Sequence, residues 1–192
     1  MNSYRTRRSV FFLTLLWAVT SCSTATTTAR TTEFSSFRFP NQLANFIRGD
    51  LHRYPSPELG ASVPYTHERE AITLTLYVYN GGEGKIPSGP GPAAEAQLKS
   101  ATINVATLVR MKRYKSARVL GRKVVPFGEP PRKMLRTLLR IEIGGGVSES
   151  QIIVTGWKGQ FFKVRASYPS HLSRPARGSI HQFLDAFVIA NH

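Results

Sequence analysis

Cysteine, acidic residues and long apolar segments are all scarce in this sequence. Cys22 is the only cysteine among 192 residues, so no intrachain disulfide can form. The apolar run Val10–Val19 has ten residues, one of them Thr, whereas a membrane-spanning helix needs about 20. We therefore expect neither a disulfide-stabilised fold nor a permanent transmembrane helix.

Recognisable catalytic and metal-binding motifs are missing as well. No serine lies in a Gly-x-Ser-x-Gly elbow, and the glycine-rich segment 81–85 lacks Walker spacing. The five histidines show no paired spacing typical of a metal site. Glu68 and Glu70 could act as the paired carboxylates of a hydrolase, although a hairpin turn would carry charged residues anyway. The sequence thus indicates no catalytic residue, no cofactor and no metal.

The first residues have the order of a secretory signal peptide. Residues 1–8 contain Arg5, Arg7 and Arg8 and no acid, and the apolar run follows them closely. We expect residues 1–21 to be removed during export. Paired arginines also occur in twin-arginine leaders, so the general secretory and twin-arginine routes both stay open.

The segment Val19-Thr20-Ser21-Cys22 at the end of the apolar run resembles the lipobox of bacterial lipoproteins. The resemblance implies that Cys22 becomes the mature N-terminus, that its thiol carries a diacylglycerol, and that its amine carries a further acyl chain such as palmitate. Several chains are needed because each buried methylene contributes only about 0.8 kcal/mol. We therefore expect a lipid-anchored, periplasm-facing protein. Ser23 stands where aspartate retains enterobacterial lipoproteins in the inner membrane, so the outer membrane is favoured.

The mature chain divides into a tether and a folded part. Residues 22–32 are expected to be the lipidated N-terminus and a Thr/Ser-rich tether, because they contain almost nothing that could build a core. Residues 33–192 have the length of one globular domain.

Alternating side chains predict a series of strands. Ile72–Tyr79 alternates aliphatic residues with Thr and Tyr, the pattern of a strand with one buried face. Leu59–Tyr65 could pair with it in a hairpin, with Pro64 favouring an edge position. Four further strands are predicted at the spacing of an antiparallel meander: Ala117–Val125, Met134–Ile143, Gln151–Thr155 and Gln160–Ser167.

Two helices complete the predicted fold. Ala93–Arg113 places six apolar residues on one stripe, with Pro92 suited to the first turn. Ser179 is expected to cap a final helix whose apolar face packs on the sheet. Together the elements predict an α+β fold, an antiparallel sheet with both main helices packed on one face. The two apolar stripes are Ala94, Leu98, Ala101, Val105, Leu108 and Val109, and Ile180, Phe183, Leu184 and Phe187.

The order of these elements, together with the segment Gly159-Gln160-Phe161-Phe162-Lys163-Val164-Arg165, resembles the PsbP-like fold of photosystem accessory proteins and is similar to envelope lipoproteins of bacteria. No functional motif is part of this resemblance, so it implies a fold and no activity.

Positive charge dominates the chain and is unevenly distributed. The sequence has 26 Lys and Arg against 11 Asp and Glu, and between Arg110 and Arg140 Glu129 is the only acid among eleven basic residues. Such clustering attracts anionic partners. For an exported lipoprotein these would be anionic lipid, lipopolysaccharide or acidic protein, whereas nucleic acid normally lies on the other side of the membrane and is not expected.

Two pairs of cations are candidates for binding an anion. Arg136 and Arg140 share one face of a predicted strand, and Lys163 and Arg165 share one face of a later strand. We predict that all four lie on the outer face of the sheet. The alternative is a solvated sheet face with no binding role.

Three hypotheses about function follow. The first is a non-enzymatic binding or assembly factor for an anionic component of the cell envelope. The second is an accessory subunit of an envelope complex that binds protein through an apolar groove. The third and weakest is an envelope hydrolase. The sequence leaves the oligomeric state open.

Overall fold

The computed structural model of the chain describes residues 32–192. The signal peptide, the lipobox with Cys22 and the tether as far as residue 31 lie outside the described residues. In chain order the elements are β1 (Thr32–Phe34), β2 (Phe37–Phe39), β3 (Gln42–Leu43), β4 (Phe46–Arg48), β5 (His52–Arg53), the 3-10 turn η1 (Pro57–Leu59), β6 (Ala61–His67), β7 (Thr73–Tyr79), α1 (Pro92–Arg110), β8 (Ser116–Phe127), β9 (Arg132–Ile143), β10 (Gly146–Trp157), β11 (Gln160–Pro169), the 3-10 turn η2 (Ser170–Leu172) and α2 (Ser173–Ala190).

Nine of these strands form one antiparallel sheet with the order β3-β4-β6-β7-β11-β10-β9-β8, in which β5 also pairs with β6. The strands β1 and β2 form a separate hairpin. Helix α1 connects β7 to β8 at the far edge of the sheet, and the chain then returns strand by strand until β11 pairs with β7. The predicted α+β class and the antiparallel meander are confirmed.

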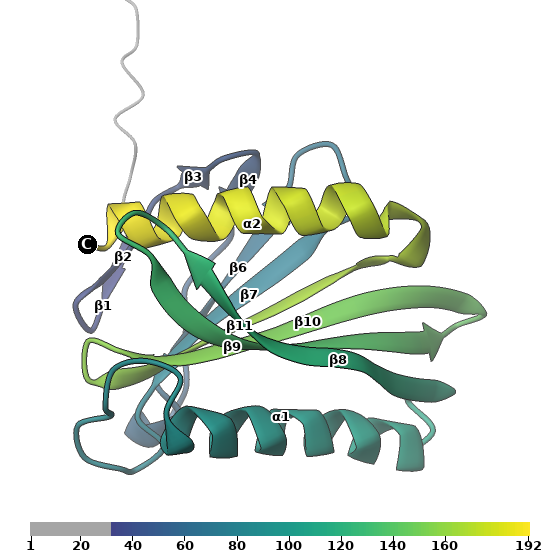
Figure 1. Ribbon diagram of the computed structural model, residues 1–192, viewed down its shortest axis with the longest axis horizontal. Coiled ribbons are helices and arrows are strands. Elements are labelled where there is room, and N and C mark those ends of the chain that lie inside the picture. Colours follow the sequence, from purple (N-terminus) through teal and green to yellow (C-terminus); the bar gives the residue numbers. More distant parts are fainter. Residues whose placement is uncertain (1–31) are drawn as a thin grey trace, which may run out of the picture.

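The two helices cover opposite faces of the sheet, as Figure 1 shows. The prediction that both pack on one face is therefore wrong. The central strand β10 explains the arrangement, because successive side chains of a strand point to opposite faces. Ile152 and Val154 belong to the core beneath Leu98 of α1, while Ile153 belongs to the core beneath Phe183 of α2. Consecutive apolar residues of this kind are typical of a strand buried on both sides.

The hairpin β6–β7 is present as predicted, but Pro64 does not lie on an edge strand. Two short strands flank β6 on the side away from β7: β4 pairs with residues 65–67 and β5 with residues 61–62. Pro64 lies between the two pairings, so the missing N–H of proline interrupts the ladder without breaking the sheet. The amide of Gly49 donates a hydrogen bond to the Pro64 carbonyl at 2.8 Å and continues the contact.

Helix α1 agrees with its prediction, whereas α2 begins earlier than expected. The predicted stripe of α1 contains the buried residues Ala94, Leu98 and Val105. Helix α2 starts at Ser173, six residues before the predicted cap, so Ser179 is an internal residue whose hydroxyl donates to the Pro175 carbonyl. Pro175 lies in the first turn, where a proline needs no backbone donor, and this allows the earlier start.

A cluster of aromatic rings fills the core between α2 and the sheet. The Phe162 ring stacks on Phe37 at 5.8 Å and on Phe187 at 5.1 Å, and Trp157 meets Phe37 edge-on at 5.1 Å. Burying each of these side chains stabilises the fold by about 1.5–3 kcal/mol. The apolar face predicted for the last helix thus packs as expected.

The two ends of the described chain are held together. Asn191, just after α2, donates a side-chain hydrogen bond to the Arg38 carbonyl at 2.9 Å and accepts one from the Arg38 amide at 2.7 Å. Lys158 donates from Nζ to the Ser36 carbonyl at 2.8 Å. The β1–β2 hairpin is therefore fixed to both α2 and the β10–β11 turn.

Candidate functional site

Two of the four predicted cations lie together on the face of the sheet that α2 covers in part. Arg136 and Arg140 are four residues apart on β9 and therefore point to the same face of the sheet. Arg140 lies opposite Glu149 of β10. Arg177, which belongs to the first turns of α2, reaches the same carboxylate. The fold thus brings two arginines, one from β9 and one from α2, to one acid, while Arg136 lies further along the same face of β9.

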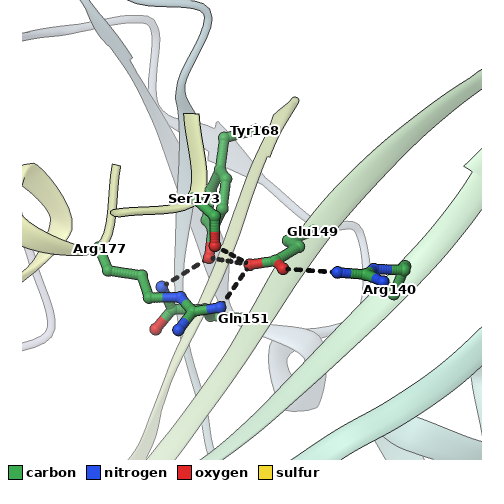
Figure 2. A network of polar contacts seen from close by, with 6 residues as sticks. All are labelled: Arg140, Glu149, Gln151, Tyr168, Ser173 and Arg177. Atoms are coloured by element: carbon green, nitrogen blue, oxygen red, sulfur yellow. Dashed lines mark hydrogen bonds and ion pairs between the residues drawn. The ribbon is translucent and has the colours of Figure 1, made fainter. Parts of the chain in front are cut away.

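Glu149 is buried, with 2% of its side chain exposed, and its carboxylate accepts hydrogen bonds from several donors. Its Oε2 accepts from Ser173 Oγ at 2.7 Å, from Arg177 Nη2 at 2.7 Å and from the Tyr168 hydroxyl at 3.2 Å. Its Oε1 lies 3.6 Å from Arg140 Nη2. Figure 2 shows these groups converging on the carboxylate.

The ionisation of this network follows from its contacts. Burial alone would raise the pKa of the Glu149 carboxyl, but hydrogen bonds from Ser173 and Arg177 and the charge of Arg177 outweigh it and hold the pKa below its ordinary value. Hydrogen bonds to Glu149 and Tyr168 raise the pKa of Arg177 in turn. Glu149 and Arg177 are therefore both charged at neutral pH.

One carboxylate cannot neutralise this cluster. Burial and the charge of Arg177 lower the pKa of Arg136, which shows that one arginine repels the other across the network. Two more cations stand on the neighbouring edge strand, where Arg118 is the cross-strand partner of Arg140 and Lys123 that of Arg136. Both side chains are exposed. We call this set the basic face: Arg118, Lys123, Arg136, Arg140 and Arg177.

Lys163 and Arg165 lie on the opposite face of the sheet, so the prediction of four cations on one face is wrong. The register explains the error: Arg136 is paired with Ile153, whereas Arg165 is paired with Ile152. Neighbouring residues of β10 point to opposite faces, and the two cation pairs are separated in the same way. Each pair shares one face, but the two faces are not the same.

Lys163 and Arg165 instead line the side of the sheet that α1 covers. Lys163 Nζ lies 4.4 Å from the centre of the Tyr77 ring and 5.0 Å from that of Tyr79. Arg165 donates from Nη2 to the Tyr114 hydroxyl at 2.8 Å. Both cations are half-buried.

Sequence reasoning missed Glu149 and Arg177. Arg177 was outside the predicted helix because that helix was started at Ser179. Glu149 lies on a part of β10 that was not predicted as strand, since residues 148–150 are all polar. A signal was nevertheless present, because Glu149 is the single acid within the long strand Gly146–Trp157.

Glu68 and Glu70, the paired carboxylates considered for a hydrolase, lie in the turn between β6 and β7 and form hydrogen bonds there. His67 is buried, and its Nδ1 accepts hydrogen bonds from the amides of Arg69 at 3.2 Å and Glu70 at 3.0 Å. The Glu70 carboxylate accepts a hydrogen bond from Ser179 of α2, and that of Glu68 accepts one from Gln42. These contacts hold the turn against its neighbours.

Residues 32–192 contain neither a cluster of metal-binding side chains nor a helix that could span a membrane. Within that range no three His, Cys, Asp or Glu side chains gather as they would around a metal ion. No helix in the same range combines the length and the apolar character required to cross a membrane.

The sequence matches no protein-family model and no curated protein. Among solved structures, the chain is similar to the solution structure of cyanobacterial PsbP (CyanoP) from Synechocystis sp. PCC 6803, with a TM-score of 0.51. The two chains are 14% identical over 78% of this chain and 83% of the other. At that identity the likeness shows the fold alone, and in fold the expected PsbP-like arrangement is confirmed.

Proposed function

We propose that this protein is a lipid-anchored, periplasm-facing lipoprotein of the cell envelope, on the outer membrane, that works without catalysis as a binding or assembly factor. Its ligand is an anionic envelope component, and the basic face binds it. The observation that carries the proposal is the convergence of Arg140 and Arg177 on the buried carboxylate of Glu149, with Arg136 further along the same face of β9.

The geometry supports an anion-binding role in two ways. Glu149 fixes Arg177 and Arg140 in place, so these side chains lose little conformational freedom when a ligand arrives. Arginine also presents several N–H donors in a plane, which suits the oxygens of phosphate and carboxylate groups. The exposed Arg118 and Lys123 extend the face along the edge strand.

Vesicle capture tests the proposal with the lipidated full chain. The protein is inserted through its anchor into phosphatidylcholine vesicles, and the capture of labelled vesicles with and without phosphatidylglycerol is measured. We expect capture to require phosphatidylglycerol and to fall with added salt. Because each cation near an anionic surface contributes about 1 kcal/mol, Arg118→Gln combined with Lys123→Gln should weaken capture about tenfold or more.

A matched pair serves as the control. Arg110→Gln with Arg113→Gln removes the same charge from the exposed end of α1 and the segment just after it, outside the basic face. Capture that falls equally in both double variants would show attraction by net charge and contradict the proposal. A second double variant, Arg136→Gln with Arg140→Gln, tests the inner part of the face, and lipopolysaccharide in place of phosphatidylglycerol distinguishes the two sources of phosphate.

A second candidate function is that of an accessory subunit that binds protein through an apolar groove. A hollow of about 510 Å³ lies between α1 and the β8–β9 hairpin, lined in part by Ala96, Leu98, Val124 and Leu135. Val124 is 49% exposed. Lys123 and Arg136 of the basic face also line this hollow, whereas Arg118 does not. If this function holds, crosslinking in intact cells should capture one partner that Val124→Glu loses and that Arg118→Gln retains.

A further inference from the structure

A second recess, separate from the basic face, lies on the other side of the sheet between α1 and the strands β7 and β11. It consists of two adjoining hollows of about 270 and 130 Å³, which share four of their lining residues. We call it the tyrosine groove and define it by Tyr54, Tyr77, Tyr79, Ala101, Asn104 and Lys163.

The groove contains a cation with no opposite charge beside it. Among residues 32–192, neither Asp nor Glu lines the two hollows, while Lys163 and Arg165 both do. Burial and the charge of Arg165 lower the pKa of Lys163. Taking an ammonium group out of water is unfavourable, and the Tyr77 and Tyr79 rings compensate for this only in part.

The walls of the groove are held in place before any ligand arrives. The Tyr79 hydroxyl donates to Gln97 Oε1 at 3.0 Å, and the Tyr54 hydroxyl lies 3.2 Å from Ser62 Oγ. Burial raises the pKa of Tyr79 to about 12, so its hydroxyl stays neutral at physiological pH. The rings of Tyr54 and Tyr79 therefore present apolar surface to the hollow, and their hydroxyl groups are already hydrogen-bonded within the protein.

Helix α1 contributes the opposite wall with small or polar residues. Ala101 and Asn104 line both hollows. Ala101 lines the same two hollows as Lys163, and its short side chain takes up little of their volume. The groove thus combines an apolar body, a cationic end made by Lys163 and, in the smaller hollow, Arg165, and a volume near the lower limit of small-molecule sites.

We infer that the tyrosine groove binds a small organic carboxylate with an apolar body, whose carboxylate pairs with Lys163 and whose body lies against the tyrosine rings. This inference is independent of the basic face, because the two surfaces lie on opposite sides of the sheet.

A titration with 4-phenylbutyrate, followed by NMR of the full chain, tests the inference. We expect 4-phenylbutyrate to bind, and acetate and the uncharged 4-phenylbutan-1-ol to bind at least about tenfold more weakly, since each lacks one of the two parts. Lys163→Met should weaken binding of the acid about tenfold and leave that of the alcohol unchanged. Binding of the acid should also raise the pKa of the Lys163 ammonium group.

Two further variants guard against a general effect. Lys133→Met removes an exposed lysine outside the groove and should leave binding unchanged, whereas Asn104→Trp should block the groove through an exposed position. The inference would be overturned by an acid and an alcohol that bind equally, by a Lys163→Met variant that binds like Lys133→Met, or by no detectable binding of the acid.

Discussion

Glu149 is the acid at the centre of the basic face, and its ionisation connects that face to the stability of the fold. Its carboxylate accepts hydrogen bonds from Ser173, Arg177 and Tyr168. These donors come from β11 and α2, so the carboxylate of a β10 residue joins three neighbouring elements. Replacing it should therefore affect stability as well as charge.

The first prediction concerns Glu149→Gln. The glutamine amide has only one oxygen and cannot accept all the hydrogen bonds that the carboxylate accepts. We therefore expect a loss of about 1–3 kcal/mol in the free energy of unfolding at neutral pH. The folded state holds the pKa of Glu149 below its ordinary value. Its stabilising effect is therefore complete above the unfolded pKa of about 4.3 and is lost as the pH falls through the lower folded value.

Urea unfolding at neutral pH and between about pH 5 and pH 3 measures this dependence. The stability of the wild type should fall more steeply with acid than that of Glu149→Gln. Glu83→Gln, which changes an exposed loop residue, is the control and should follow the wild type. Parallel curves for Glu149→Gln and the wild type would show that the carboxylate does not stabilise the fold by its charge.

At this scale the sequence predicted part of the site. The spacing of Arg136 and Arg140 placed both on one strand face, and the structure confirms it. The sequence could not show whether that pair shares a face with Lys163 and Arg165, because it does not give the register between neighbouring strands. The relation depends on which residue of β10 pairs with which residue on either side, and only the folded sheet sets it.

Elements were predicted best where they are long. The alternating segment of β7 and the apolar stripe of α1 each extend over enough residues to show their period. The strands from β1 to β5 have two or three residues each, which is too short for any alternation to appear. Their buried side chains, such as Phe37 and Phe46, belong to the core although no pattern marked them.

The turn between β8 and β9 gives a second prediction, because it packs against α2 through a glycine. Gly128 has a φ of 78° and donates its amide hydrogen to Asp185 Oδ1 at 2.7 Å. A Cβ atom there would lie 2.3 Å from Val188 Cγ1. Gly128→Ala should therefore lower the free energy of unfolding by about 2–3 kcal/mol, from backbone strain and from displacement of Val188.

Gly144→Ala separates the two causes. Gly144 also has a positive φ, of 55°, but a Cβ atom there would have no neighbour within 4 Å. It should cost only the backbone part, about 1 kcal/mol, in urea unfolding. If the two variants lost equal free energy of unfolding, displacement of Val188 would add nothing to the cost of the backbone strain.

The two candidate binding surfaces of the molecule are separated because its helices lie on opposite sides of the sheet. The basic face lies on the side of α2, and the tyrosine groove lies beside α1. Local patterns did not predict this, since β7 pairs with β11, more than 80 residues later in the chain. The path of α1 across the sheet decides which face it covers, and the periodicity of α1 alone contains no such information.

The last prediction concerns how the whole protein is held in the envelope. The lipobox resemblance implies acylation of Cys22, and Cys22 is the only cysteine of the chain. Labelled palmitate supplied to cells that produce the protein should therefore appear in the wild type and be absent from Cys22→Ser, with the protein itself detected in both. Ser23→Ala, next to the acylated residue, should keep the label because the lipobox ends at the cysteine. Label that persisted in Cys22→Ser would show that the palmitate is attached elsewhere than at Cys22 and would contradict the prediction. An unlabelled wild type would show that the protein carries no palmitate anchor. In that case the basic face alone would have to supply membrane attachment, and attachment would then be lost at high salt.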